Sequence, residues 1–407
     1  MRTSIAAFVI ASTALSMGAA RGEEWPRYRG PRGDGIVRDA KIGEKWPAKG
    51  PRERWRAEVG AGYASPIGVS DVVYAFALDN GKETLTAFAA DSGKVLWREA
   101  YAGGWDGSYP GTRATPVVDG GAIYTLGGGG DLVKRAQKDG KLQWRVNVLM
   151  GTGSSNLQWG TASSPLVDGK VLYVQGGQGG PVALAIDTAS GAVIWLSEAR
   201  GDAGYATPIR IGEGAAARLI VFGGDTLFGM HPSTGKSAWS EPWRTSYGVN
   251  AAAPIHKDGL LFASSAYGRG SVMVRALPDK VEKVWQSREV ATRFNAAILD
   301  GDTIYANSEG ELKALGWKDG KLLWAAKKTE FSLGMGGSIV RAGDKLLMLG
   351  ERGALSLARA TPGGVQRLAQ AQILDGSENW ATPLVYKNRL YVKGETKMVC
   401  FDLPAQE

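Results

Sequence analysis

One pattern of turns, strands and aromatic residues recurs along nearly the whole chain, and it constrains the fold more than any other feature. Each copy begins with a small residue and proline, as at Ser65-Pro66. An alternating apolar strand, a turn and further strands follow, and the copy ends in a Gly-Lys turn and a strand that carries tryptophan. These tryptophans are Trp97, Trp144, Trp195, Trp239, Trp285 and Trp324, spaced 39 to 51 residues apart. Such a period indicates one four-stranded antiparallel sheet per copy.

Eight copies can be counted, although the sixth lacks the proline and the seventh is degenerate. The eighth ends before its tryptophan strand, while one such strand, Glu53-Arg54-Trp55-Arg56, is left over near the front. We expect this strand to complete the last sheet, because closing the ring removes exposed sheet edges. The sequence therefore predicts an all-β fold: an eight-bladed β-propeller of four-stranded antiparallel blades, closed by N-terminal strand pairing with the last blade. It should occupy residues 45–407, after an N-terminal extension at 23–44.

The recurring residues have structural roles in this interpretation. Glycine in the Gly-Lys turns supplies positive φ, proline suits a strand start where no amide donor is needed, and tryptophan packs between neighbouring blades. The single cysteine, Cys400, lies in an apolar strand and should be a small buried hydrophobe rather than a reactive thiol.

Residues 1–22 have the features of a signal peptide. Arg2 supplies a positive charge, residues 5–15 are apolar, and small residues allow cleavage after Ala20 or Gly22. The apolar stretch is too short for a transmembrane segment, so an uncleaved anchor is the less favoured alternative. We expect an exported protein, periplasmic or secreted after cleavage, with no lipid attached at a signal-proximal cysteine.

Composition disfavours several classes of ligand. The net charge is +8, but the basic residues are scattered among 40 acidic ones and form no run, so we predict no nucleic-acid partner. The two histidines, His231 and His256, are far apart and only one cysteine is present. We therefore predict no metal site.

The repeat, and above all its Gly-Lys-x-x-Trp endings, resembles that of the pyrroloquinoline quinone (PQQ)-like, or quinoprotein-type, β-propeller family. The leading segment Trp25-Pro26-x-Tyr28-Arg29-Gly30-Pro31 and the segment Tyr109-Pro110-Gly111-x-Arg113 are similar to an exported bacterial, BamB-like subgroup. This resemblance covers about residues 45 to 403.

The resemblance implies two kinds of function. PQQ dehydrogenases carry a vicinal cysteine pair, oxygen ligands for calcium and an aspartate base; this chain has one cysteine and no segment that matches the others. We therefore predict no catalytic residues and an exported, non-catalytic binding or scaffold module, in the manner of BamB in envelope protein assembly. The alternative is a PQQ-dependent alcohol or sugar dehydrogenase that binds PQQ with calcium.

Propellers bind ligands at the mouths of the central channel. The loops that precede the Ser/Thr-Pro elements are rich in aromatic, amide and charged residues, and on a rigid scaffold such loops often carry function. The predicted binding residues are Tyr109, Arg113, Asn156, Gln158, Trp159, Tyr205, Tyr247, Asn250, Arg293, Asn295, Glu378 and Trp380, and the same loops contain Phe294 and Asn379. Strand capping by these side chains is the structural alternative. We expect a protein or saccharide ligand and a monomeric protein.

Overall fold

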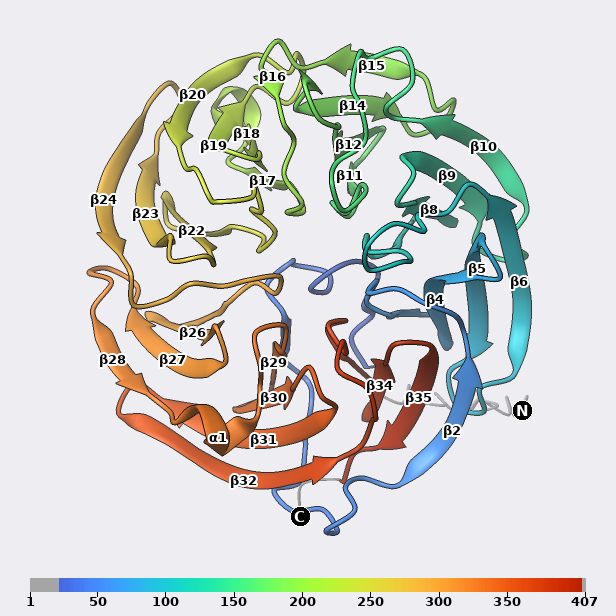
Figure 1. Cartoon of the computed structure of the whole chain (residues 1–407), viewed down its shortest axis with the longest axis vertical. Coiled ribbons are helices and arrows are strands. Elements are labelled where there is room, and N and C mark those ends of the chain that lie inside the picture. Colours follow the sequence, from blue (N-terminus) through green and yellow to red (C-terminus); the bar gives the residue numbers. More distant parts are fainter. Residues whose placement is uncertain (1–21, 405–407) are drawn as a thin grey trace, which may run out of the picture.

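The computed structural model describes residues 22–404, so almost all of the predicted signal peptide lies outside the described residues. The described chain forms a closed ring of eight blades around a central channel (Figure 1). This confirms the predicted fold and number of blades.

In the first seven blades the strands run from the channel outward in chain order, and in the eighth the outermost strand comes from the front of the chain. The first four blades are β3 (Ile67–Val69), β4 (Val72–Asp79), β5 (Lys82–Ala89) and β6 (Val95–Ala102); β7 (Val117–Asp119), β8 (Ala122–Leu126), β9 (Asp131–Ala136) and β10 (Leu142–Asn147); β11 (Leu166–Asp168), β12 (Val171–Gln175), β14 (Ala183–Asp187) and β15 (Val193–Leu196); and β17 (Ile209–Ile211), β18 (Arg218–Phe222), β19 (Thr226–Met230) and β20 (Ser237–Pro242).

The last four blades repeat this order. They are β21 (Ile255–Lys257), β22 (Leu260–Ser265), β23 (Gly270–Ala276) and β24 (Val281–Ser287); β25 (Ile298–Asp300), β26 (Thr303–Ser308), β27 (Glu311–Gly316) and β28 (Leu322–Ala325); β29 (Ser338–Ala342), β30 (Lys345–Leu349), β31 (Ala354–Thr361) and β32 (Gly364–Gln372); and β33 (Leu384–Tyr386), β34 (Arg389–Lys393), β35 (Lys397–Asp402) and β2 (Glu53–Glu58). Short additional elements are β1 (Ile36–Val37), β13 (Gly180–Pro181), β16 (Arg200–Gly201), a 3-10 turn (Gly214–Ala216) and α1 (Lys328–Phe331).

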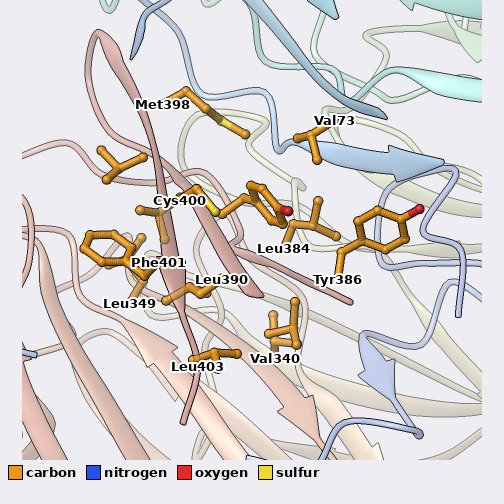
Figure 2. Close-up of a cluster of buried hydrophobic side chains, with 14 of the residues drawn as sticks. Val73, Val340, Leu349, Leu384, Tyr386, Leu390, Met398, Cys400, Phe401 and Leu403 are labelled. Atoms are coloured by element: carbon orange, nitrogen blue, oxygen red, sulfur yellow. The ribbon is translucent and has the colours of Figure 1, made fainter. Parts of the chain in front are cut away.

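Ring closure occurs as predicted. Strand β2 pairs antiparallel with β35, and Trp55 lies opposite Cys400 (Figure 1). Cys400 is fully buried in a cluster that joins the seventh, eighth and first blades, among Met398, Phe401 and Leu390 (Figure 2). The strand from the front of the chain thus completes the eighth sheet and its core.

The tryptophans pack between blades, as the sequence predicts. Trp97 of β6 lies against Gly140 of the next blade and donates its indole N–H to the Gln137 carbonyl at 3.2 Å. A Cβ on Gly140 would lie 2.7 Å from the Trp97 ring, and the φ of Gly140 is 73°, so only glycine fits this turn. The same contact with a glycine and the same indole hydrogen bond recur at Trp55, Trp144, Trp195 and Trp285.

The Ser/Thr-Pro elements link neighbouring blades close to the channel. The Thr382 amide donates to the Ser65 hydroxyl at 3.0 Å, and the Ser65 amide donates to the Thr115 hydroxyl at 3.2 Å. The series continues from Thr115 to Ser164 at 2.9 Å and from Ser164 to Thr207 at 3.3 Å. Five blades are therefore joined by one chain of hydrogen bonds.

The segment at 23–37 crosses the middle of the ring, where it is the blue trace in Figure 1. Trp25 pairs with Gly68 of the first blade, and β1 adds to β29 of the seventh in parallel. Between them, the buried Arg29 donates to the carbonyls of Ala296 and Ala297 at 3.1 and 2.7 Å. The segment thereby fastens blades on different sides of the ring to one another.

None of the helices within residues 22–404 has the length and apolarity that crossing a membrane requires.

Candidate functional site

The channel holds a cavity of about 520 Å³, which we call the cup. Its lining residues are Tyr28, Tyr63, Ser65, Tyr109, Arg113, Thr115, Trp159, Ala162, Ser164, Tyr205, Thr207, Tyr247, Val249, Ala251, Tyr267, Arg293, Phe294, Asn295 and Trp380. Tyr28 comes from the segment that crosses the ring, and the others come from loops and strand starts around it. A cavity of this size, ringed by aromatic residues with a few polar groups, is typical of ligand sites.

The aromatic residues of the cup form two groups. In the first, Trp380 contacts Tyr63, Phe294 and Tyr109, with ring centroids 4.8, 4.9 and 5.3 Å away. Trp380 fits there because Gly336 carries no side chain; a Cβ on Gly336 would lie 2.1 Å from the indole.

In the second group, Trp159 contacts Tyr205 at 5.9 Å and Tyr247 at 6.4 Å. Tyr247 in turn contacts Tyr267 at 5.3 Å. Burial raises the pKa of Tyr205 to about 12, so its hydroxyl stays protonated near neutral pH. Tyr205 therefore presents a neutral, amphipathic ring to the cup.

Arg113 and Arg293 stand between the two groups. The guanidinium of Arg113 lies 5.5 Å from the Tyr63 ring, and that of Arg293 lies 5.2 Å from Tyr267 and 5.3 Å from Phe294. Burial lowers the pKa of Arg113 to about 10, which leaves it charged at neutral pH. Cations above aromatic faces are held by the ring quadrupole, so Arg293 links the two aromatic groups and Arg113 packs on the first.

The two arginines differ in their hydrogen bonds. Arg113 donates to the carbonyls of Gly111 at 2.7 Å and Ser108 at 3.3 Å and so holds the loop that carries Tyr109. Arg293 contacts the Met335 sulfur at 2.8 Å, and its buried Nε has no hydrogen-bond partner within the described residues. Arg293 is therefore the arginine free to meet an acceptor in the cup.

Two tyrosines of the cup adopt the left-handed backbone conformation, which bulky residues rarely take. The φ angle is 59° at Tyr109 and 60° at Tyr267. Such conformations cost about 1–3 kcal/mol and persist where the surrounding structure holds them, often at ligand sites. The backbone conformation at these two residues thus directs the rings of Tyr109 and Tyr267 into the cup.

The structure brings together eight of the twelve residues predicted for the channel mouth: Tyr109, Arg113, Trp159, Tyr205, Tyr247, Arg293, Asn295 and Trp380 line the cup. Whether they contact a ligand remains a prediction. The side chain of Asn295 also bridges blades, because its amide donates to the Gly336 carbonyl at 2.9 Å and accepts from the Thr382 hydroxyl at 2.9 Å.

The other four predicted residues lie outside the lining, three of them with structural contacts. Asn250 is fully buried and donates to the Gly223 carbonyl at 2.7 Å, and Asn156 donates to the Gly128 carbonyl at 2.9 Å. Glu378 accepts a hydrogen bond from the Tyr63 hydroxyl at 2.6 Å; burial, and after it this hydrogen bond, raises the pKa of Tyr63. Gln158 is exposed.

The twelve predicted residues do not include four aromatic residues of the cup: Tyr28, Tyr63, Tyr267 and Phe294, the last of which lies between the predicted Arg293 and Asn295. Tyr63 stands two residues before Ser65 in the same kind of loop, so the rule that found Tyr205 and Trp380 applies to it. Tyr28 and Tyr267 had no such signal. Tyr28 lies outside the repeat, and Tyr267 lies in a turn between strands rather than before a Ser/Thr-Pro element.

The residues of the cup do not fit PQQ held with calcium. Calcium takes oxygen ligands, chiefly carboxylates, and dehydrogenation needs a base, yet none of the lining residues is Asp or Glu. The carboxylate of Glu378 is occupied by the Tyr63 hydroxyl behind the wall. No group of three or more His, Cys, Asp or Glu side chains able to hold a metal ion occurs in the described part of the chain.

Comparisons with known proteins agree with the repeat. Residues 45–241 match the family model described as "Outer membrane protein assembly factor BamB". The structure is similar to BamB from Moraxella catarrhalis, with a TM-score of 0.64 and 14% identity over 87% of this chain and 100% of that one. A comparison with curated protein sequences gives no match.

Two solved enzymes share the architecture. A europium-containing methanol dehydrogenase has a TM-score of 0.64 and 14% identity, over 91% of this chain and 89% of that one. A quinohemoprotein alcohol dehydrogenase from Comamonas testosteroni has a TM-score of 0.65 and 14% identity, over 96% and 82%. Likeness at such identities shows a shared fold and leaves the function to the site.

Proposed function

Because the chain belongs to the PQQ-like β-propeller family, we propose that it is an exported, non-catalytic member that binds a saccharide or protein ligand in the cup. The observation that carries this proposal is the composition of the wall: nine aromatic rings and two arginines line the cavity and no carboxylate does. Such a wall can bind and orient a ligand. It offers neither a carboxylate base nor carboxylate ligands for calcium, which the alternative, dehydrogenation with PQQ, would need.

Export follows from the predicted signal peptide, and a role beside the outer-membrane assembly machinery would parallel the BamB description of the family model. Whether the ligand is a saccharide or a protein, we expect it to bind in the cup.

The binding role can be tested with two glycine variants. Gly336→Ala places a methyl group against Trp380 and should displace that ring, whereas Gly363→Ala meets only the Thr361 hydroxyl at 3.8 Å and serves as the matched control. Titration of the full exported chain with a panel of soluble oligosaccharides and envelope proteins, followed by tryptophan fluorescence, should find a ligand that Gly336→Ala weakens and Gly363→Ala does not.

Equal binding by both variants would place the site elsewhere. The enzyme alternative has its own assay: the chain is mixed with PQQ, Ca²⁺, an alcohol or sugar and a redox dye. We expect no dye reduction, and reduction that depends on PQQ would refute the non-catalytic role.

A further inference from the structure

We propose that the cup receives the end of an acidic saccharide chain, a terminal uronic-acid ring whose carboxylate meets Arg293. This inference rests on the proposed binding function and names its ligand class.

The positive charge of the cup favours an anionic ligand. Arg113 and Arg293 are its charged lining residues, and no carboxylate in the described chain lies within ion-pairing distance of either. Arg113 is occupied by loop carbonyls, whereas the Arg293 guanidinium lines the cup and, within the described residues, has the Met335 sulfur as its acceptor and no oxygen. A ligand carboxylate would accept charge-assisted hydrogen bonds from the terminal N–H groups of this guanidinium with good geometry.

The walls match the surface of a sugar. A pyranose ring has apolar C–H faces and a rim of hydroxyls, and tyrosine and tryptophan likewise combine an apolar ring with one polar atom. The cup contains six tyrosines: Tyr28, Tyr63, Tyr109, Tyr205, Tyr247 and Tyr267. Their hydroxyls can hydrogen bond to sugar hydroxyls while their rings pack on C–H faces.

A peptide is the less favoured occupant. Extended peptides are recognised chiefly through main-chain hydrogen bonds to a free sheet edge. At the channel, the amides of Ser65, Thr115 and Ser164 already donate to hydroxyls of the next blade, and a proline follows each of these residues. The wall thus offers side chains rather than a main-chain edge.

The segment at 23–37 closes one end of the cup and forms its floor. The cup can therefore hold the end of a saccharide chain but not its middle. The segment at 23–37 crosses the ring, Tyr28 lines the cavity, and Arg29 is tied to Ala296 and Ala297. A polymer therefore cannot thread through the channel. Two aromatic residues, Tyr109 and Tyr247, are 44% and 60% exposed, which leaves room for the rest of a chain to pass outward over them.

The test titrates the full exported chain with short and long oligogalacturonates, with neutral oligogalactose of equal length, and with an acidic peptide such as oligoglutamate. The uronates should bind more tightly than the neutral sugar. Arg293→Gln should weaken uronate binding by about tenfold to a hundredfold, the range expected for losing a charged hydrogen bond. Arg275→Gln, which removes an exposed arginine on β23, should leave binding unchanged.

Stoichiometry tests the chain-end geometry. One protein should bind per chain whatever the length of the uronate, and several proteins on a long chain would overturn end recognition. Equal affinity for neutral oligogalactose would overturn the anionic class while leaving the proposed function intact. Binding of oligoglutamate alone would overturn the saccharide class. No binding of any of these ligands, together with equal behaviour of Gly336→Ala and Gly363→Ala across the wider panel, would refute the proposed function as well.

Discussion

The buried carboxyl group of Glu83 should make the unfolding free energy of the protein depend on pH. Glu83 lies in β5 and is completely buried between the first two blades; its Oε1 accepts the Gly128 amide at 2.7 Å, and Oε2 has no hydrogen-bond partner in the described structure. Burial raises its pKa from 4.5 to about 7; the nearby Tyr101 hydroxyl, the Gly128 amide and Arg145 oppose the shift, and Asp131 adds to it. The folded protein therefore holds this proton more tightly than the unfolded chain does.

The direction and size of the effect follow from linkage. A carboxyl group whose pKa is raised on folding contributes stability that is fully present below pH 4.5 and is lost as the pH rises through about 7. The shift from 4.5 to 7 corresponds to about 3 kcal/mol at 1.36 kcal/mol per unit. Glu83→Gln keeps an oxygen for the Gly128 amide but cannot ionise, so the variant should lose this pH dependence.

The assay is urea unfolding of wild type and Glu83→Gln between pH 4.5 and 8. The difference in unfolding free energy should shift by about 3 kcal/mol in favour of the variant as the pH rises. Glu289→Gln, at an exposed carboxylate, is the control and should show no such trend. A difference that stays constant with pH, or that favours wild type more at high pH, would refute the reasoning.

Three further variants test the packing around the site, each by urea unfolding. Trp97→Ala removes the indole that fills the contact with Gly140 and should lower the unfolding free energy by about 3 kcal/mol; a change below about 1 kcal/mol would contradict the role of the tryptophans. Lys393→Met removes a buried ammonium group that donates to the Gly62 carbonyl at 2.5 Å, and leaving buried carbonyls unpaired should cost about 2 kcal/mol. Arg29→Ala should cost about 3 kcal/mol and make the segment at 23–37 cleavable by protease in the native protein, which intact resistance would disprove.

The sequence predicts most of the fold, because the repeat encodes contacts that recur. Five of the tryptophans pack on a turn glycine of the next blade, as Trp97 packs on Gly140, so the period of this pair of residues gives the number of blades. Ring closure follows from counting strands. The strand that carries Trp55 precedes the first copy of the repeat, and the eighth copy lacks its tryptophan strand, so the two pair. The fold was therefore predictable without coordinates.

The composition of the site was predictable only in part. A loop amide such as Asn250 looks the same in sequence whether it faces the channel or, as here, donates to buried carbonyls. Tyr28 lies outside the repeat, so no periodic position assigns it to the channel, and only the hydrogen bonds of Arg29 to the sixth blade show where the segment crosses. The contacts of single side chains, rather than the pattern, decide these cases.

Part of the cup lies at blades whose sequence differs from the Ser/Thr-Pro pattern of the repeat. Five blades have a hydroxyl residue two positions before their first strand: Ser65, Thr115, Ser164, Thr207 and Thr382. In the fifth, sixth and seventh blades the equivalent residues are Ala253, Ala296 and Gly336, which lack that hydroxyl. Tyr28 packs on the two alanines, and Trp380 lies on the glycine. The lost hydroxyls would leave the hydrogen-bond chain and the packing incomplete, but Arg29, Tyr28 and Trp380 fill these positions. Departures from a repeat that the structure compensates in this way are expected at functional sites, and here they coincide with the floor and one wall of the cup.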